Sequence, residues 1–104
     1  MATGEYWAVS AANDKLEELG YTLSLAGNGC DANISPSDFD GAWEEVDATG
    51  HGFIRYEKDE HRVTLSILLQ GVPNEAIYDY SWNTDKAWGD ADLAVESAQS
   101  VAEW

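Results

Sequence analysis

Carboxylates dominate the residues of this chain that could do chemistry. Asp and Glu supply 20 of the 104 residues, whereas the chain has two histidines, His51 and His61, and one cysteine, Cys30. No two of these three residues have the spacing of a zinc-binding pair, and no phosphate-binding or nucleophile-elbow motif is present. Among twenty acids some pair always lies within reach, so their abundance does not indicate acid–base catalysis. We therefore expect a protein that is not an enzyme and has no catalytic residue, metal or cofactor.

One group of acids shares a narrow face of the helix expected at the end of the chain. At about 100° per residue the members of this stripe are Asp85, Asp92, Glu96 and Glu103. The stripe would extend over about 27 Å, and acids one turn apart would be about 6 Å from each other, similar to phosphates along a nucleic-acid strand. No Lys or Arg lies on it. We interpret the stripe as a candidate partner-binding site; the alternative is an ordinary solvated helix face.

A second acidic segment follows the clearest helix start in the sequence. Ser35 has the type of a capping residue, Pro36 suits the first helical position, and Asp38 would lie at the third. Five acids and no base flank the apolar stripe of this helix: Asp38, Asp40, Glu44, Glu45 and Asp47. Helices normally intersperse Lys or Arg four residues away, so the missing bases indicate a use for the negative field. Asp38 has a structural explanation, because an acid near the start of a helix interacts favourably with the helix dipole. The other four acids are candidate partner-binding residues.

The segment that begins at Asp47 resembles the start of an EF-hand loop. It follows an apolar-striped helix and has Asp at loop position one, Thr49 at three and Gly52 at six. It departs from the EF-hand pattern where coordination is decided, because position five is His51 and position twelve, which requires a bidentate Glu, is Lys58. The following residues alternate like a strand. We expect a helix end that feeds a hairpin, with a calcium site as the alternative, and we assign no metal ligand.

Net charge limits the partners of the chain. Five cations face twenty acids, which gives a formal net charge of −15, and 12% of the residues are aromatic, as in a folded domain. This field repels nucleic acid and anionic membranes and attracts a basic protein surface. A lone cysteine, a start without the signal-peptide pattern and the lack of a membrane-length apolar run lead us to expect a cytoplasmic protein, with a phage-infected bacterium as one setting.

The hydrophobic pattern predicts a single α+β domain over residues 1–104, in the order α-β-α-β-β-β-α, with a mostly antiparallel sheet packed by helices. We expect helices from a Thr3 cap to Leu19, ended by Gly20, from Ser35 to about Gly50, and from an Asn83 or Thr84 cap towards Trp104. The expected strands cover residues 21–26, 52–58, 62–70 and 76–82.

Three buried faces follow from the same pattern. In the first strand the expected inward residues are Tyr21, Leu23 and Leu25. The last helix has an apolar stripe that consists of Trp88, Ala91, Val95, Ala98 and Ala102. Along the last strand Tyr78, Tyr80 and Trp82 share one face, which we expect to pack under a helix as core. If Ile77 points inward instead, these aromatics form an exposed contact surface.

In size, charge and carboxylate spacing the chain resembles the small acidic inhibitors made by phages and other mobile elements, the anti-CRISPR and anti-restriction proteins. No family motif is matched, so no residue roles are carried over. The resemblance implies a nucleic-acid mimic that inhibits a nucleic-acid-binding protein or complex through its basic surface. We expect no direct contact with nucleic acid or membrane, and a monomer or a homodimer. The alternatives are an ordinary domain of a salt-adapted organism, an acidic immunity protein for a basic nuclease toxin, and a degenerate EF-hand-like protein.

Overall fold

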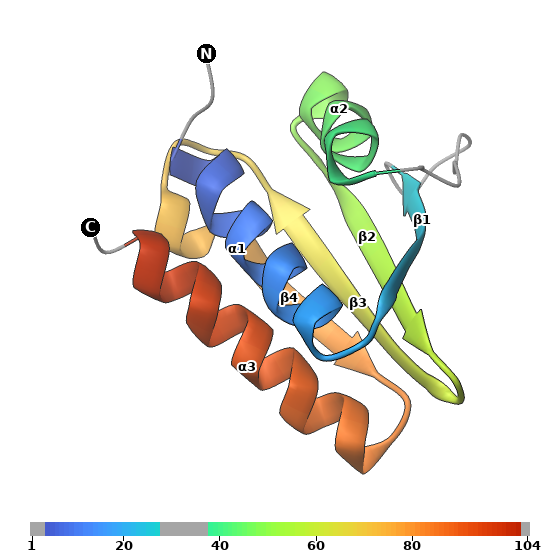
Figure 1. Cartoon of the computed structure of the whole chain (residues 1–104). Helices are drawn as coiled ribbons and strands as arrows, with labels where there is room; N and C mark the ends of the chain where they lie inside the picture. Colours follow the sequence, from blue (N-terminus) through green and yellow to red (C-terminus); the bar gives the residue numbers. More distant parts are fainter. Residues whose placement is uncertain (1–3, 28–37, 103–104) are drawn as a thin grey trace.

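The computed structural model describes residues 4–27 and 38–102, which fold into helices on one antiparallel sheet. The elements are α1 (Gly4–Glu18), β1 (Thr22–Gly27), α2 (Phe39–Thr49), β2 (His51–Lys58), β3 (His61–Leu68), the 3₁₀ helix η1 (Pro73–Glu75), β4 (Ile77–Trp82) and α3 (Asp85–Ala102) (Figure 1). The sheet order is β1-β2-β3-β4, and all neighbouring strands are antiparallel. This confirms the α+β class and the element order that the sequence predicted.

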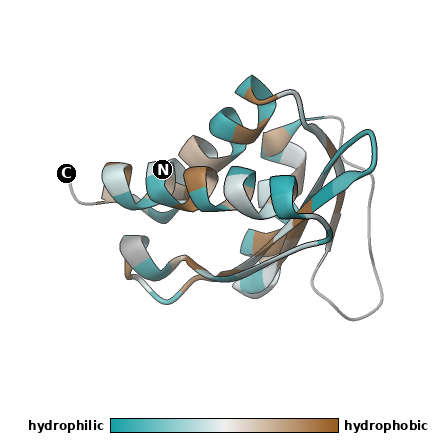
Figure 2. Ribbon diagram, turned by 90° about the horizontal axis from the view of Figure 1, so that it is seen from below, coloured by the Kyte–Doolittle hydropathy of each residue, from teal (hydrophilic) through white to brown (hydrophobic). Residues whose placement is uncertain are grey.

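Burial alternates along the two central strands. The fully buried side chains are Ile54 and Tyr56 of β2 and Val63, Leu65 and Ile67 of β3, and they form one core with α1, α2 and α3. The residues between them are not buried. Because successive side chains of a strand point to opposite faces, the helices cover one face, and no helix among the described residues covers the other. Seen from below, the helices alternate between hydrophilic and hydrophobic residues, as expected for helices with one buried face (Figure 2).

Small side chains bring α1 and α3 together on the sheet. The two helices lie side by side (Figure 1), and the core residues that they contribute include Ala8 and Ala12 of α1 and Ala87, Ala91, Ala94 and Ala98 of α3. An alanine face allows close helix packing. For this reason the apolar stripe predicted for α3 is wrong in part: Ala87 and Ala94 are buried, whereas Trp88 is 49% exposed. None of the described helices has the length and apolar character to cross a membrane.

The helix ends follow the capping rules with one correction. Gly20, with φ +98°, ends α1 in a Schellman motif, since its N–H donates to Glu17 O and the next N–H donates to Leu16 O. Gly50, with φ +80°, ends α2 as expected. Asp38 is the cap of α2 and not its third residue, because its side chain accepts from Gly41 N at 2.8 Å. Ser35 and Pro36, which were expected to begin this helix, lie outside the described residues.

The start of α3 resolves the choice between Asn83 and Thr84. Thr84 is the cap, since its hydroxyl accepts from Ala87 N at 3.1 Å. Asn83 has a different role, because its side-chain amide binds Arg62 N at 2.7 Å and Glu60 O at 2.8 Å. Asn83 therefore ties the β4–α3 connection to the β2–β3 turn.

Irregular pairing in the two edge strands overturns two predicted faces. In β1 the register shifts between Leu23 and Leu25, so Leu23 pairs with Tyr56 on the covered face whereas Leu25 pairs with Arg55 on the open face. The predicted inward position of Leu25 is therefore wrong, and Ala26 is buried instead.

In β4 the register shifts near Ser66, which puts Ile77 opposite Ile67 on the covered face. Tyr80 packs against the core, but Trp82 is 46% exposed and Tyr78 is 62% exposed. The prediction that all three aromatics are core is wrong for these two. The alternative is right that Ile77 points inward, but the register shift leaves Tyr80 and Trp82 on the same covered face, opposite Leu65 and Val63.

A partly buried polar chain connects α3 to Tyr21, which lies between α1 and β1. Tyr21 OH donates to Asp90 Oδ2 at 2.8 Å, and Lys86 Nζ donates to the same oxygen at 3.0 Å. Burial by itself would raise the pKa of Asp90, but the hydrogen bonds from Lys86 and Tyr21 outweigh burial and lower this pKa. Asp90 is therefore a structural acid and not part of a partner-binding surface.

We expect the variant Asp90→Asn to unfold more easily than the wild type at neutral pH, by about 1.5–3 kcal/mol, because it loses charge-assisted hydrogen bonds. A carboxyl group whose folded pKa is lowered stabilises the fold above its unfolded pKa, about 3.9, and this contribution is lost as the pH falls through the folded pKa. The gap between the two proteins should close in that acidic range. Urea unfolding at several pH values measures it, with Glu96→Gln as control; a gap independent of pH would contradict this role.

Two glycines predict opposite effects of alanine. A Cβ on Gly52 would collide with the backbone of Gly27 in the neighbouring strand, whereas a Cβ on Gly89 in α3 has open space around it. Gly52→Ala should therefore lower the free energy of unfolding by more than 1 kcal/mol, and Gly89→Ala should raise it by about 0.5–1 kcal/mol. Denaturant unfolding of both variants tests the β1–β2 pairing. Equal effects of the two substitutions would show that this close approach is wrong.

Candidate functional site

Charge is divided unequally between the two layers of the fold. The bounds of α1, α2 and α3 contain twelve Asp or Glu residues and two lysines. Residues 51–84, which form β2, β3, β4 and their connections, contain five acids and three cations. Two helix acids, Glu5 and Asp90, are buried, and the other ten lie at least partly exposed. The negative field is therefore concentrated on the helical face of the molecule.

The first candidate surface lies on α2. Asp40, Glu44 and Asp47 are spaced four and three residues apart and are exposed, whereas Glu45 is half-buried on a different side of the helix. Tyr6 of α1 donates to Asp40 Oδ1 at 2.6 Å, and this hydrogen bond raises the pKa of Tyr6. The ring of Tyr6 also contacts the rings of Phe39 and Trp43. The α2 acids are thus bordered by an aromatic cluster that fixes Asp40.

The second candidate surface combines α3 with β4. Asp85 and Glu96 are exposed, and Asp92 is half-buried because Tyr80 OH lies 3.5 Å from its Oδ1. Trp88 borders this acidic stripe of α3, and its ring meets the ring of Trp82 edge-on at 6.3 Å between centroids. We define the α3–β4 surface as Tyr80, Trp82, Asp85, Trp88, Asp92 and Glu96. Glu103, which was predicted as part of the stripe, lies outside the described residues.

These two surfaces are on opposite flanks of α1 (Figure 1). The structure therefore does not merge the predicted acids into one cluster. It places between them three exposed α1 acids that the sequence interpretation missed, Asp14, Glu17 and Glu18. Their three-and-four spacing is the signal that could have found them. Glu17 also lines a hollow of about 250 Å³ together with Asp38, the cap of α2, so α1 continues the negative face towards α2.

Three of the five cations of the chain pair with acids outside the candidate surfaces. Lys15 pairs with Glu18 at 3.5 Å, Arg62 with Glu57 at 3.6 Å and Lys86 with Asp90 at 3.0 Å. Among the described residues, no Lys or Arg pairs with any of the seven candidate acids, which are Asp40, Glu44, Glu45, Asp47, Asp85, Asp92 and Glu96. These carboxylates are left available to an external cation.

The described residues offer little for metal binding or catalysis. They contain no group of three His, Cys, Asp or Glu side chains that could hold a metal ion. His51 is exposed, and His61 Nδ1 lies 2.7 Å from Thr84 Oγ1, where it supports the α3 cap. After α2 ends at Thr49 the chain continues as β2 and not as a second helix, which confirms the expected helix end feeding a hairpin. Cys30 lies outside the described residues.

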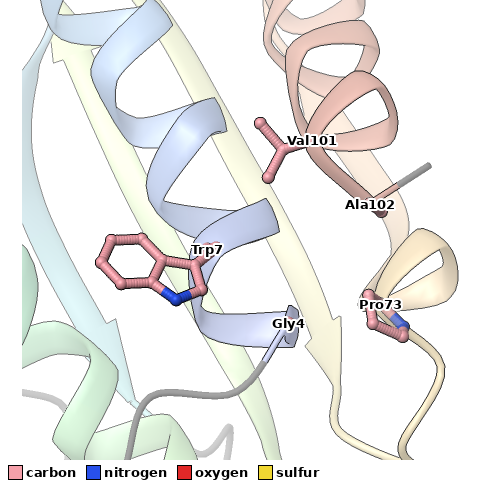
Figure 3. A pocket seen from close by; sticks show the side chains of 5 residues that line it. All are labelled: Gly4, Trp7, Pro73, Val101 and Ala102. Atoms are coloured by element: carbon pink, nitrogen blue, oxygen red, sulfur yellow. The ribbon is translucent and has the colours of Figure 1, made fainter. Parts of the chain in front are cut away.

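An apolar hollow of about 480 Å³ lies where α1, η1 and α3 meet. Its lining consists of Gly4, Trp7, Pro73, Val101 and Ala102 (Figure 3). Val101 extends from α3 towards α1, and Trp7 is 55% exposed. No carboxylate is among these residues, so the hollow is chemically separate from the acidic surfaces.

Comparison of the chain with protein-family models, curated proteins and solved structures found no match.

Removing like charges from α2 should stabilise the fold. We expect the double variant Glu44→Gln, Asp47→Asn to raise the free energy of unfolding by about 0.5 kcal/mol at low salt, because the two carboxylates repel each other and Asp47 opposes the helix dipole. This gain in unfolding free energy should fall in about 1 M NaCl, because salt at that concentration screens the repulsion between the carboxylates. Urea unfolding in both buffers measures it. Glu18→Gln, which loses its pairing with Lys15, should show no gain; a loss of stability in the double variant would mean that these acids are structural.

Proposed function

We propose that this chain is a non-catalytic binding protein that presents carboxylates in place of a phosphate backbone and so inhibits a nucleic-acid-binding protein or complex. The observation that carries the proposal is the charge division between layers, with twelve acids and two lysines within the helices. Acidity retained only to adapt to salt would not need to favour one face. The negative potential of this face would attract a partner with a basic groove, and this attraction would increase the rate of association.

Aromatic side chains beside the acids supply contact energy that charge alone lacks. On the α3–β4 surface, Trp82 and Trp88 are each about half exposed and contact each other edge-on. Interface hot spots are enriched in Trp and Tyr, whereas exposed ion pairs contribute little by themselves. Trp88 lies between Asp85 and Asp92 on the helix, so a partner Lys or Arg could contact an indole ring and a carboxylate together. This arrangement supports the α3–β4 surface as the centre of the interface.

The spacing of the acids supports mimicry of a phosphate backbone. Asp92 and Glu96 are one helical turn, about 6 Å, apart, which is similar to the through-space distance between consecutive phosphates of one strand. Lys and Arg side chains that normally hold phosphates would bind these carboxylates by the same charge-assisted hydrogen bonds. The partner's groove would then be occupied and closed to nucleic acid. An acidic immunity protein for a basic nuclease toxin would use the same chemistry.

The proposal is tested with the DNA-binding fraction of a bacterial lysate, obtained on a DNA column after nuclease treatment. We expect the immobilised chain to retain proteins from this fraction at low salt, to release them when duplex DNA is added, and to lose them as salt increases. Three triple variants carry the same change in charge. The α3–β4 variant is Asp85→Asn, Asp92→Asn, Glu96→Gln; the α2 variant is Asp40→Asn, Glu44→Gln, Asp47→Asn; the control on the sheet layer is Asp59→Asn, Glu60→Gln, Glu75→Gln.

We expect the α3–β4 variant to lose at least about tenfold in affinity for a retained protein, while the sheet-layer control changes little, because only contact carboxylates are desolvated on binding. The α2 variant shows whether the second surface contributes. Equal losses of affinity in all three variants would mean that binding depends only on net charge. Failure of DNA to compete with the chain for the retained proteins would exclude mimicry. Unfolding of the wild type on transfer to low salt would favour a salt-adapted domain instead.

A further inference from the structure

We propose that the open face of the sheet carries a binding site for a small oxyanion, a carboxylate or phosphate group, beside the guanidinium of Arg55. This site lies on the face opposite the helices and does not depend on the proposed function. It is carried by an unpartnered arginine, a row of polar side chains across three strands and a hollow that they line.

Arg55 is the exception among the cations of this acidic chain. Lys15, Arg62 and Lys86 pair with carboxylates, and Lys58 Nζ donates to Leu19 O at 2.8 Å. Within the described part of the chain the Arg55 guanidinium has no ion pair, and its Nε is shut off from solvent without a hydrogen-bond acceptor. An arginine is always charged and its donors are rarely left unsatisfied, so this guanidinium is the cation of the chain best placed to bind an external acceptor.

The sheet places hydroxyl groups beside this guanidinium. Arg55 pairs with Thr64 in β3, and Thr64 pairs with Ser81 in β4, so the three side chains form a row on the open face. A hollow of about 190 Å³ lies along the row, lined by Arg55, Arg62, Thr64, Ser81, Trp82 and Asn83. The lining therefore offers two guanidinium groups and two hydroxyl donors. This is the donor set that recognises a carboxylate or a phosphate.

Neighbouring groups hold Arg55 in place and regulate access to the hollow. The guanidinium lies 5.9 Å from the centre of the Phe53 ring, which supports it from one side. Glu57 competes for the site, because it lies on the same face and pairs with Arg62 at 3.6 Å; both side chains are about half exposed. Asp79, opposite Ser66, is a second acid of this face. An entering oxyanion would bind Arg55 and draw Arg62 away from Glu57.

The site is tested with inorganic phosphate and acetate as probes on the full chain. Nuclear magnetic resonance follows the Nε–Hε signal of Arg55 and the backbone N–H signal of Ser81 while each anion replaces chloride at constant ionic strength. We expect both signals to shift saturably, whereas the indole signal of Trp7, at the apolar hollow, stays unchanged. Saturation by both anions supports a general oxyanion site, and saturation by phosphate alone supports a phosphate site.

Variants separate this site from the net charge. Arg55→Gln should weaken binding at least about tenfold, as measured at the backbone N–H of Ser81, because a charge-assisted contact is lost. Lys15→Gln removes the same charge elsewhere and should change the affinity little. Glu57→Gln should strengthen binding severalfold, because it frees Arg62; this variant keeps the test decisive if Arg55→Gln fails to fold. Shifts no larger than those caused by chloride, or equal weakening by Lys15→Gln and Arg55→Gln, would overturn the proposal.

Discussion

Mutual repulsion among acidic groups is the constraint on which the rest of this structure depends. A net charge of −15 opposes any compact state, so the fold needs a core dense enough to offset that repulsion. The core meets this need with aliphatic side chains from β2 and β3 and with alanines where α1 and α3 lie together. Because alanine allows close helix approach, the helices bury narrow faces, and their remaining circumference is free to carry carboxylates.

The scarcity of cations decides how those carboxylates are used. Lys86 is committed to the buried Asp90, and Lys58 binds the carbonyl oxygen of Leu19 just after α1. Lys58 thus joins β2 to the end of α1, Lys86 pairs within α3, and neither lysine neutralises the outer faces of α2 and α3. Two of the three cations in residues 51–84 instead lie on the open face of the sheet, Arg55 and Arg62. Negative charge is therefore distributed unequally between the two layers, and the sheet layer is the less acidic one.

Aromatic placement follows from the same packing. The alanine face of α3 points at α1, which turns Trp88 outward to meet Trp82 at the β4 edge. The exposed halves of this Trp pair would be removed from water only if a partner or another surface covered them, and their burial would then stabilise the contact. The acidic stripe and the exposed aromatics on α3 thus have one cause, which is the rotation of the helix set by its small residues.

Local physics in the sequence determined the class of the fold, its element order and most of its helix ends. Alternating hydrophobicity predicted the strands, and Gly20 and Gly50 predicted the ends of two helices. The seven-and-four spacing of acids predicted the stripe of α3. Each of these signals operates within a few residues of the chain. Only the tertiary structure decided what depends on pairing between distant segments. The register shifts in β1 and β4 turned Leu25 and Ile77 to faces opposite to those expected. The strand register likewise aligned Arg55 with Thr64 and Ser81, and the packing of the layers placed the acids of three helices on one face. No local spacing in the sequence encodes which residues become neighbours across strands and helices.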